Sequence, residues 1–313
     1  LAPDGDPRRG IDGWRLDVAS DIGTAFWRDW RAHVKSLNPH AVILGEVWFP
    51  AERFLGAEGF DGQMNYPWAT AVTKWLGGEQ AYTSAHLARA LDQLLGNHPA
   101  AELVHMSILG SHDTDRISSM LFNPGRPYDQ GRSPRDDPGY QDARPPDEID
   151  RRVILGVALL TLWPGAPMIY NGDEYGVHGG DDPDCRKPIP WPDLGTHPRP
   201  DHAPDLAQRE RFRAWLRLRQ DGVIGPVLRF GAVALQPSRH ADVLTLERRL
   251  GGHVVRAILN RNRSFIGLEE VLPDGWPTAG WRLVESDEPA AAVPGLRAMI
   301  WVGTESAQEG ERR

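Results

Sequence analysis

The sequence predicts an α/β region followed by an all-β region. Through about residue 222, short apolar strand patterns alternate with helical patterns, which is typical of a parallel sheet. From about residue 223, short segments of alternating hydrophobicity take over, which indicates an antiparallel β-sandwich. A chain of 313 residues is long enough for two such units. We therefore expect domains at 1–222 and 223–305, with a polar tail at 306–313.

The composition excludes several classes of partner. A net charge of -8 and the lack of any Lys/Arg run longer than two residues argue against a nucleic-acid-binding protein. No apolar stretch reaches the roughly 20 residues that span a bilayer, so no membrane partner is expected. The single cysteine, Cys185, excludes an internal disulfide framework and is compatible with the cytoplasm. No signal peptide pattern stands at residue 1.

The first β/α unit has the clearest pattern. Gly13–Asp17 predicts a short strand, and Thr24–Leu37 predicts a helix with Phe26, Trp30, Val34 and Leu37 on one face. Thr24 is the expected N-cap of that helix. A second strand is expected at Ala41–Gly45, directly before Glu46.

The alternation continues along the chain, giving at most five β/α units. Residues 123–147 are rich in Pro, Asp and Arg and predict an exposed loop. The other expected elements of this region are helices at Pro67–Leu76, Ser84–Leu95, Glu148–Thr161 and Ala207–Gln220, and strands at Val104–Leu109 and Ala166–Tyr170. The strands expected in the all-β region are Val227–Leu235, Val243–Arg249, Val254–Leu259, Trp281–Glu285 and Arg297–Val302.

Three acidic residues follow expected strands of the α/β region: Asp17, Glu46 and Asp113. Carboxyl ends of parallel strands are where α/β barrels place their chemistry. Arg15 lies two residues before Asp17, so both side chains share one face of the strand. A single acid after a strand more often caps the next helix, but three in succession favour a catalytic set.

The sequence around these acids resembles a known family. Gly13–Asp17, Gly45–Trp48 and Ser111–Thr114 resemble the second, third and fourth conserved regions of the α-amylase family of glycoside hydrolases, family 13. Gly165–Gly176 resembles the motif at the eighth strand of that family. Two further segments, Phe60–Pro67 and Gly180–Pro188, resemble the subgroup of cyclomaltodextrinases, neopullulanases and maltogenic amylases.

The resemblance implies a fold. It indicates a partial (β/α)8 TIM barrel, comprising about strands four to eight with their helices, followed by an antiparallel β-sandwich. The strand at Gly13–Asp17 corresponds to the fourth strand of the family, and the first three have no counterpart. Five units cannot close a barrel, so edges at Gly13–Asp17 and Ala166–Tyr170 would be exposed. We hypothesise that the isolated chain is poorly stable, or that it forms a homo-oligomer through the open face.

The resemblance also implies a reaction. It is the retaining hydrolysis of α-1,4-glucosidic bonds in cyclodextrins, maltooligosaccharides or pullulan, through a covalent glucosyl–aspartate intermediate. Asp17 becomes the nucleophile, Glu46 the acid/base, and Asp113 the stabiliser of the transition state. Arg15 and His112 become contacts of the cleaved sugar. Such a reaction uses two neighbouring carboxyl groups and an oxocarbenium-like transition state.

Further substrate contacts follow from the resemblance to the subgroup. Asp182 and Arg186 match a pair that binds sugars on the non-reducing side, although Asp182–Asp184 alone would also suit a polar turn. Trp48 either stacks on a sugar or packs internally. Cys185 is interpreted as a packing residue, because no activating partner is evident. The chemistry needs no cofactor; the family allows calcium, although the spacing in this loop suits calcium poorly.

Two other interpretations remain open at this stage. The same residues would serve an α-glucosidase or a glucanotransferase, which product analysis distinguishes from a hydrolase. Alternatively, the chain is a catalytically incomplete fragment or a carbohydrate-binding remnant, because the first three barrel strands are missing.

Overall fold

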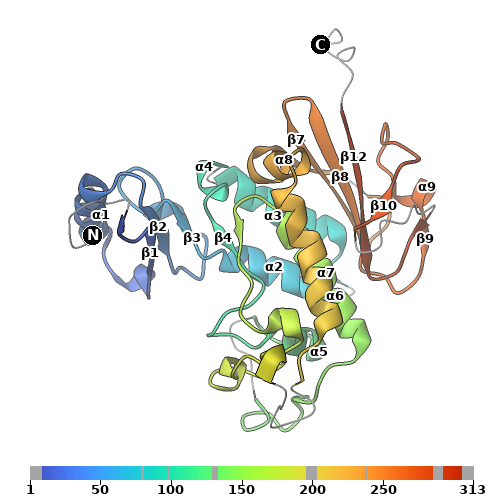
Figure 1. Ribbon diagram of the computed structural model, residues 1–313, viewed down its shortest axis with the longest axis horizontal. Helices are drawn as coiled ribbons and strands as arrows, with labels where there is room; N and C mark the ends of the chain where they lie inside the picture. Colours follow the sequence, from blue (N-terminus) through green and yellow to red (C-terminus); the bar gives the residue numbers. More distant parts are fainter. Residues whose placement is uncertain are drawn as a thin grey trace.

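The computed structural model describes residues 9–78, 81–97, 99–128, 133–194, 203–236, 238–284 and 292–304. Parallel strands dominate its first part and antiparallel strands its last part, with long helices between them (Figure 1). The order of α/β and all-β regions is therefore as predicted. The predicted polar tail at 306–313 lies outside the described residues.

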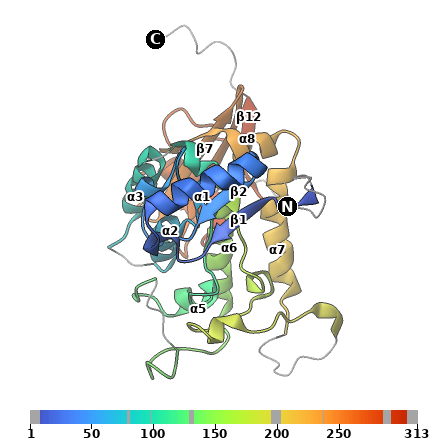
Figure 2. The same ribbon diagram turned by 90° about the vertical axis from the view of Figure 1, so that its left-hand side faces the viewer.

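The amino-terminal lobe holds a three-stranded parallel sheet. Its strands are β1 (Gly13–Leu16), β2 (Val42–Gly45) and β3 (Gly62–Gln63), in that order. Helix α1 (Thr24–Leu37) lies across β1 and β2 (Figure 2) and buries Trp27 and Val34. This lobe projects away from the helices that follow it (Figure 1).

Two details of this lobe correct the sequence analysis. Gly23 occupies the N-cap position of α1, and it provides no side-chain cap, so the N-cap prediction for Thr24 is wrong. The predicted apolar face of α1 is only partly buried, because Phe26 is 54% exposed and Leu37 is 40% exposed. Trp14 on the edge strand β1 is also exposed. The outer side of this lobe therefore carries uncovered apolar surface.

A parallel bridge between Met64 and Met106 leads from β3 to a second parallel pair. That pair is β4 (Met106–Ser107) with β5 (Ala166–Pro167), and both strands are shorter than predicted. The hydrogen bonds between β4 and β5 end one residue after the strands, where the Met168 N–H donates to the Ser107 carbonyl at 2.8 Å. Beyond these bonds the chain turns, and the predicted strands at 104–109 and 166–170 are reduced to two residues each.

A layer of helices forms the largest core of the molecule. Helix α6 is buried along almost its whole length, including Val153 and Leu160 at 0% exposure. The predicted helices are confirmed within a few residues, while α4 and α5 were not predicted. The helices of this layer are α2 (Tyr66–Leu76), α3 (Ser84–Asn97), α4 (Pro99–Glu102), α5 (Ile117–Phe122), α6 (Asp147–Leu162) and α7 (Leu206–Arg217).

The all-β region is a five-stranded antiparallel sheet, in the order β10-β12-β8-β7-β6, with the pair β9 and β11 beside it (Figure 1). The strand predicted at Val227–Leu235 is wrong in its first half. Ile224–Phe230 forms helix α8, which buries Ile224 and Val227. The bounds of the strands are β6 (Ala232–Gln236), β7 (Val243–Leu250), β8 (His253–Asn260), β9 (Ile266–Gly267), β10 (Arg282–Leu283), β11 (Ala292–Val293) and β12 (Arg297–Thr304), and a short helix, α9, spans Leu268–Val271.

Two arginines bind the end of helix α6: Arg248 of β7, which is fully buried, and Arg219 after α7, which is half-buried. Arg248 of β7 donates from Nη1 to the Leu162 carbonyl and from Nη2 to the Gly231 carbonyl at 2.7 Å. Arg219 donates from Nη1 to the Thr161 carbonyl at 2.9 Å. The last carbonyls of a helix lack partners within it and carry partial negative charge, so cations are favourable there. The arginines therefore fix the end of α6 against the β region.

Candidate active site

One guanidinium holds the first two predicted carboxylates together. Arg15 Nη1 forms an ion pair with Asp17 Oδ1, and Arg15 Nη2 lies 2.7 Å from Glu46 Oε1. Arg15 Nε also donates to Met64 Sδ at 3.3 Å. The parallel pairing of β1 with β2 ends at Leu16 and Gly45, so Asp17 and Glu46 emerge side by side. The two carboxylates are therefore immediate neighbours.

The two carboxylates differ in their surroundings. The Asp17 side chain is 74% exposed, whereas that of Glu46 is 6% exposed. Glu46 is held at both ends: its N–H donates to the Leu16 carbonyl at 2.9 Å, and its Oε2 accepts from the Val18 N–H at 2.8 Å. Val18 directs this N–H from a left-handed conformation, with φ of 46°. Glu46 is thus a fixed, buried group and Asp17 an open one.

The third predicted carboxylate, Asp113, lies in a second charged cluster. Its Oδ1 is 3.0 Å from Arg186 Nη2, and its Oδ2 is 3.2 Å from His112 Nε2. Arg186 Nε lies 2.9 Å from Asp182 Oδ1 and also donates to the His112 carbonyl at 2.9 Å. The predicted residues Asp113, His112, Asp182 and Arg186 are therefore in contact, although 73 residues separate Asp113 from Arg186.

Tyr66 lies between the two clusters and was not predicted as a site residue. Its hydroxyl donates to Ser111 Oγ at 3.1 Å, and Ser111 Oγ accepts the Asp113 N–H at 3.1 Å. Burial raises the pKa of Tyr66, and the negative charges of Glu46 and Asp113 raise it further. Both acids thus act on one phenol. The Phe60–Pro67 segment could have pointed to Tyr66, but an aromatic residue at a helix start more often belongs to the core.

Trp48 is half-buried, and one face of its ring is covered. Its ring stacks on Tyr66 with centroids 3.7 Å apart and planes at 12°. Cys185 is buried, as a packing residue should be, and its Sγ donates to the His112 carbonyl at 3.1 Å. Burial raises the pKa of the Cys185 thiol to about 11. A thiol with that pKa is a poor nucleophile near neutral pH.

No group of three or more His, Cys, Asp or Glu side chains that could hold a metal ion occurs in the described part of the chain. The carboxylates of the site are instead paired with Arg15 and Arg186.

The model of the alpha-amylase catalytic domain matches residues 7–197. This range contains every residue of both charged clusters. The chain belongs to the alpha-amylase family. The family resemblance predicted from the sequence is thereby confirmed, and so is its subgroup, because curated members of that subgroup are similar to the chain.

A cyclomaltodextrinase from Geobacillus thermopakistaniensis (strain MAS1) is 32% identical over 255 residues, covering 80% of this chain and 37% of the relative. Neopullulanase 2 from Thermoactinomyces vulgaris is 36% identical over 186 residues, covering 58% of this chain and 27% of the relative. The chain therefore spans about a third of the length of these curated relatives.

Solved structures agree on the fold. The ligand-free cyclic alpha-maltosyl-(1-->6)-maltose hydrolase from Arthrobacter globiformis superposes with a TM-score of 0.71 at 24% identity, covering 95% of this chain and 56% of that one. A cyclomaltodextrinase structure has a TM-score of 0.69 at 26% identity, covering 93% of this chain and 45% of that one.

The part of the chain that the structure describes contains no helix with the length and hydrophobicity of a membrane span.

Proposed function

We propose that the chain is a retaining α-glucan hydrolase that cleaves α-1,4-glucosidic bonds in cyclodextrins, maltooligosaccharides or pullulan. Strands β1 to β5 would be strands four to eight of a (β/α)8 barrel, within a domain 1–222 that precedes a β-sandwich at 223–305. The observation that carries the proposal is the contact of Asp17 and Glu46 with the single guanidinium of Arg15. Retaining hydrolysis requires two carboxyl groups about 5–5.5 Å apart.

In this mechanism the exposed carboxylate is the nucleophile. Asp17 attacks the anomeric carbon of the sugar, and Glu46 donates its proton to the departing glycosidic oxygen. The product of this step is a glycosyl–Asp17 ester and a new free hydroxyl, which ends a separate sugar chain when the substrate is linear and the opened chain itself when it is a cyclodextrin. Glu46 then removes a proton from water, the water attacks the anomeric carbon, and Asp17 is released as a carboxylate. The same carboxyl group of Glu46 thus serves as acid and then as base.

The second cluster binds and stabilises the reacting sugar. Asp113 would accept hydrogen bonds from sugar hydroxyls and oppose the positive charge that develops on the ring. Arg186 and His112 hold Asp113 from two sides, which fixes its carboxylate before substrate arrives. Asp182 with Arg186 would bind the next sugar on the non-reducing side. The binding partner that we propose for these residues is the α-glucan substrate.

The test of the proposal is the substitution Asp17→Asn in the full chain. Turnover of β-cyclodextrin should fall by roughly 10⁴-fold or more, because the covalent intermediate cannot form. The matched control is Asp29→Asn, since Asp29 is an equally exposed aspartate with a neighbouring arginine partner, Arg28. Proton NMR of the first products should show the α-anomer. Full activity in Asp17→Asn, an initial β-anomer, or no cleavage by the folded chain would overturn the proposal.

A further inference from the structure

Arg116 is a buried arginine to which the mechanism above gives no role. It stands at the N-cap position of helix α5 and is 1% exposed. Its Nε donates to the Cys185 carbonyl at 2.7 Å, and its Nη1 donates to the Asn171 carbonyl at 2.6 Å and to Asp173 Oδ1 at 3.0 Å. One guanidinium thus joins the segment after β4 to two others, the turn after β5 and the segment that carries Arg186.

The contact with the Cys185 carbonyl concerns the site, because Cys185 directly precedes Arg186 in the chain. The same carbonyl accepts from the Tyr170 hydroxyl at 3.3 Å, and the Arg116 guanidinium lies over the Tyr170 ring at 4.0 Å. Hydrogen bonds from a charged donor are shorter and stronger than those between neutral groups. Arg116 therefore provides the stronger of the two bonds that fix this carbonyl.

Arg186 depends on its backbone for its position. Its side chain is 46% exposed and lies 2.9 Å from Asp182 Oδ1 and 3.0 Å from Asp113 Oδ1. Exposed ion pairs contribute little by themselves, because two long side chains lose conformational entropy when they are held in one geometry. A backbone fixed at Cys185 reduces the number of positions that the Arg186 guanidinium can reach before a sugar binds.

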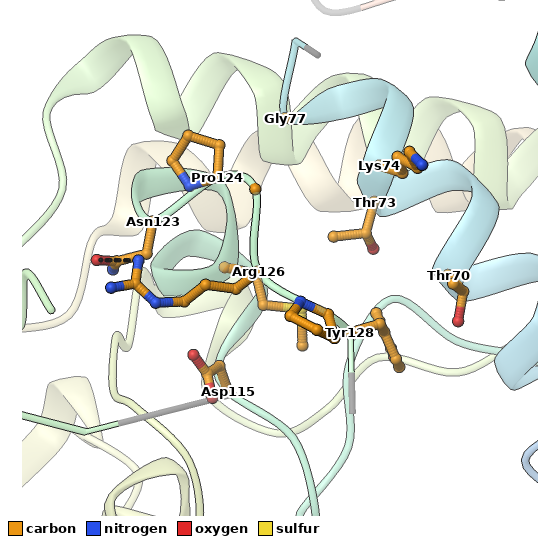
Figure 3. A pocket seen from close by; sticks show the side chains of 12 residues that line it. Thr70, Thr73, Lys74, Gly77, Asp115, Asn123, Pro124, Arg126 and Tyr128 are labelled. Carbon is orange, nitrogen blue, oxygen red and sulfur yellow. Dashed lines mark hydrogen bonds between the residues drawn. The ribbon is translucent and has the colours of Figure 1, made fainter. Parts of the chain in front are cut away.

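The neighbouring side chain, Asp115, lies in a different part of the molecule. Figure 3 shows it at one end of a cavity of about 450 Å³ between α2 and residues 123–128. Its Oδ2 accepts from the Tyr140 hydroxyl at 2.6 Å, so it holds the long segment that follows α5. Adjacent buried residues therefore have separate tasks, and Asp115 offers a control for Arg116.

We propose that Arg116 is a positioning residue for Arg186. It fixes the backbone at Cys185 and thereby determines how firmly Arg186 holds the second sugar on the non-reducing side. The sugar contact of Arg186 rests on the proposed function, whereas the bond from Arg116 to Cys185 does not. Lysine at position 116 would keep a positive charge for Asp173 but has a methylene group where arginine has Nε. Arg116→Lys thus removes the bond to Cys185 and retains the charge.

Two matched substrates measure the effect on the second sugar. When p-nitrophenol is released from p-nitrophenyl α-maltoside, the second glucose lies on the non-reducing side of the cleaved bond; p-nitrophenyl α-glucoside lacks that glucose. The ratio of the two kcat/KM values therefore reports how well the second sugar is bound in the transition state. Arg116→Lys should lower the maltoside-to-glucoside ratio roughly tenfold, the effect of losing about one hydrogen bond from a charged donor.

Three variants distinguish positioning from support of the fold. Arg152→Lys is the matched control, because Arg152 is 9% exposed, donates to the Leu76 carbonyl at 2.7 Å and pairs with Glu148 at 3.1 Å, away from both charged clusters. Arg152→Lys and Asp115→Asn should leave the substrate ratio unchanged. Arg116→Lys should also leave it unchanged in an Arg186→Ala background, because its effect acts through Arg186.

A second readout needs no turnover. The Arg186 Nε–H donates to the His112 carbonyl at 2.9 Å, so the exchange of this proton with water reports how firmly Arg186 is held. Proton–nitrogen NMR measures the exchange, and Arg186→Lys assigns the signal by its loss. Arg116→Lys should speed the exchange at least fivefold, and Arg152→Lys should not. Tyr170→Phe removes the other donor to the Cys185 carbonyl and should change both readouts in the same direction, even if Arg116→Lys fails to fold.

The outcomes separate this inference from the proposed function. In an active enzyme, an unchanged substrate ratio, an equal loss of kcat/KM on both substrates, or an effect that persists in Arg186→Ala overturns the positioning role. Unchanged exchange of the Arg186 proton in Arg116→Lys also overturns it and leaves the proposed function standing. Faster exchange in Arg116→Lys, combined with no p-nitrophenol release by the folded wild type, supports the positioning of Arg186 and contradicts the proposed function.

Discussion

Replacing Glu102 with Gln should remove a pH-dependent loss of stability. Glu102 ends helix α4 and is 4% exposed, and His105 Nε2 lies 3.5 Å from its Oε1. His105 Nδ1 accepts the Gln63 N–H at 3.0 Å, so the Nε2 atom carries the proton and faces Glu102. Burial raises the pKa of Glu102 from 4.5 to about 7. The folded protein therefore prefers the uncharged carboxyl group.

The sign and size of the effect follow from proton linkage. Between pH 4.5 and pH 7 the folded state holds more protons than the unfolded state, so the free energy of unfolding falls as pH rises. The shift corresponds to about 3 kcal/mol in total, most of which falls between pH 5 and pH 8. Glu102→Gln stays uncharged at every pH, so its free energy of unfolding should fall by about 2–3 kcal/mol less than that of the wild type across this interval.

Urea unfolding at pH 5 and pH 8 measures this difference. The comparison between wild type and variant cancels the contributions of other buried acids, such as Asp173, whose pKa burial raises to about 6. Glu58→Gln is the control, because Glu58 is exposed. If wild type and Glu102→Gln lose the same free energy of unfolding between the two pH values, the reasoning is refuted.

Two further predictions concern the contact between β7 and the end of helix α6, and Tyr66 in the candidate active site. Arg248→Met should lower the free energy of unfolding by about 2–4 kcal/mol in urea denaturation, because two buried carbonyl groups lose their donor; a loss no larger than that of exposed Arg239→Met would contradict this. Tyr66→Phe should keep the stack on Trp48 but release Ser111, and with it Asp113. Its kcat/KM should fall roughly tenfold with little change in unfolding by urea; an unchanged kcat/KM would show that the hydroxyl does not position Asp113.

The sequence predicted helices and strands well where one hydrophobic period, helical or alternating, was clear. Helix α1 has the predicted bounds, and β7 and β8 lie within a residue or so of their predicted ranges. The segment Val227–Leu235 was ambiguous, because a short apolar run suits a strand and a buried helix equally. Its first half packs as α8, where Ile224, Val227 and Leu228 are buried at helical spacing. Tertiary packing, which the local pattern does not contain, decided between the two.

In the candidate active site, too, local sequence patterns predicted some contacts, while others depend on tertiary packing. Arg15 and Asp17 lie two residues apart on one strand, so their contact was predictable from the period of a β-strand. The pairing of Arg186 with Asp113 depends on how two distant loops meet, and the sequence carried only a family resemblance for it. Arg248 was not recognised as a core residue, since arginine is rarely fully buried without a carboxylate partner. In this chain the carbonyl groups at the end of α6 take the place of that partner.

Val18 has an unfavourable backbone conformation at the position where its N–H binds the Glu46 carboxylate. A β-branched residue with φ of 46° is a steric outlier, and such a conformation costs on the order of 1–3 kcal/mol. Glycine or asparagine would adopt it more easily. The branched side chain favours other backbone conformations, so the left-handed one is held by the surrounding contacts, among them the hydrogen bond from the Val18 N–H to Glu46 Oε2. The strain at Val18 is thus a loss of stability that accompanies the fixed position of the buried Glu46 carboxylate.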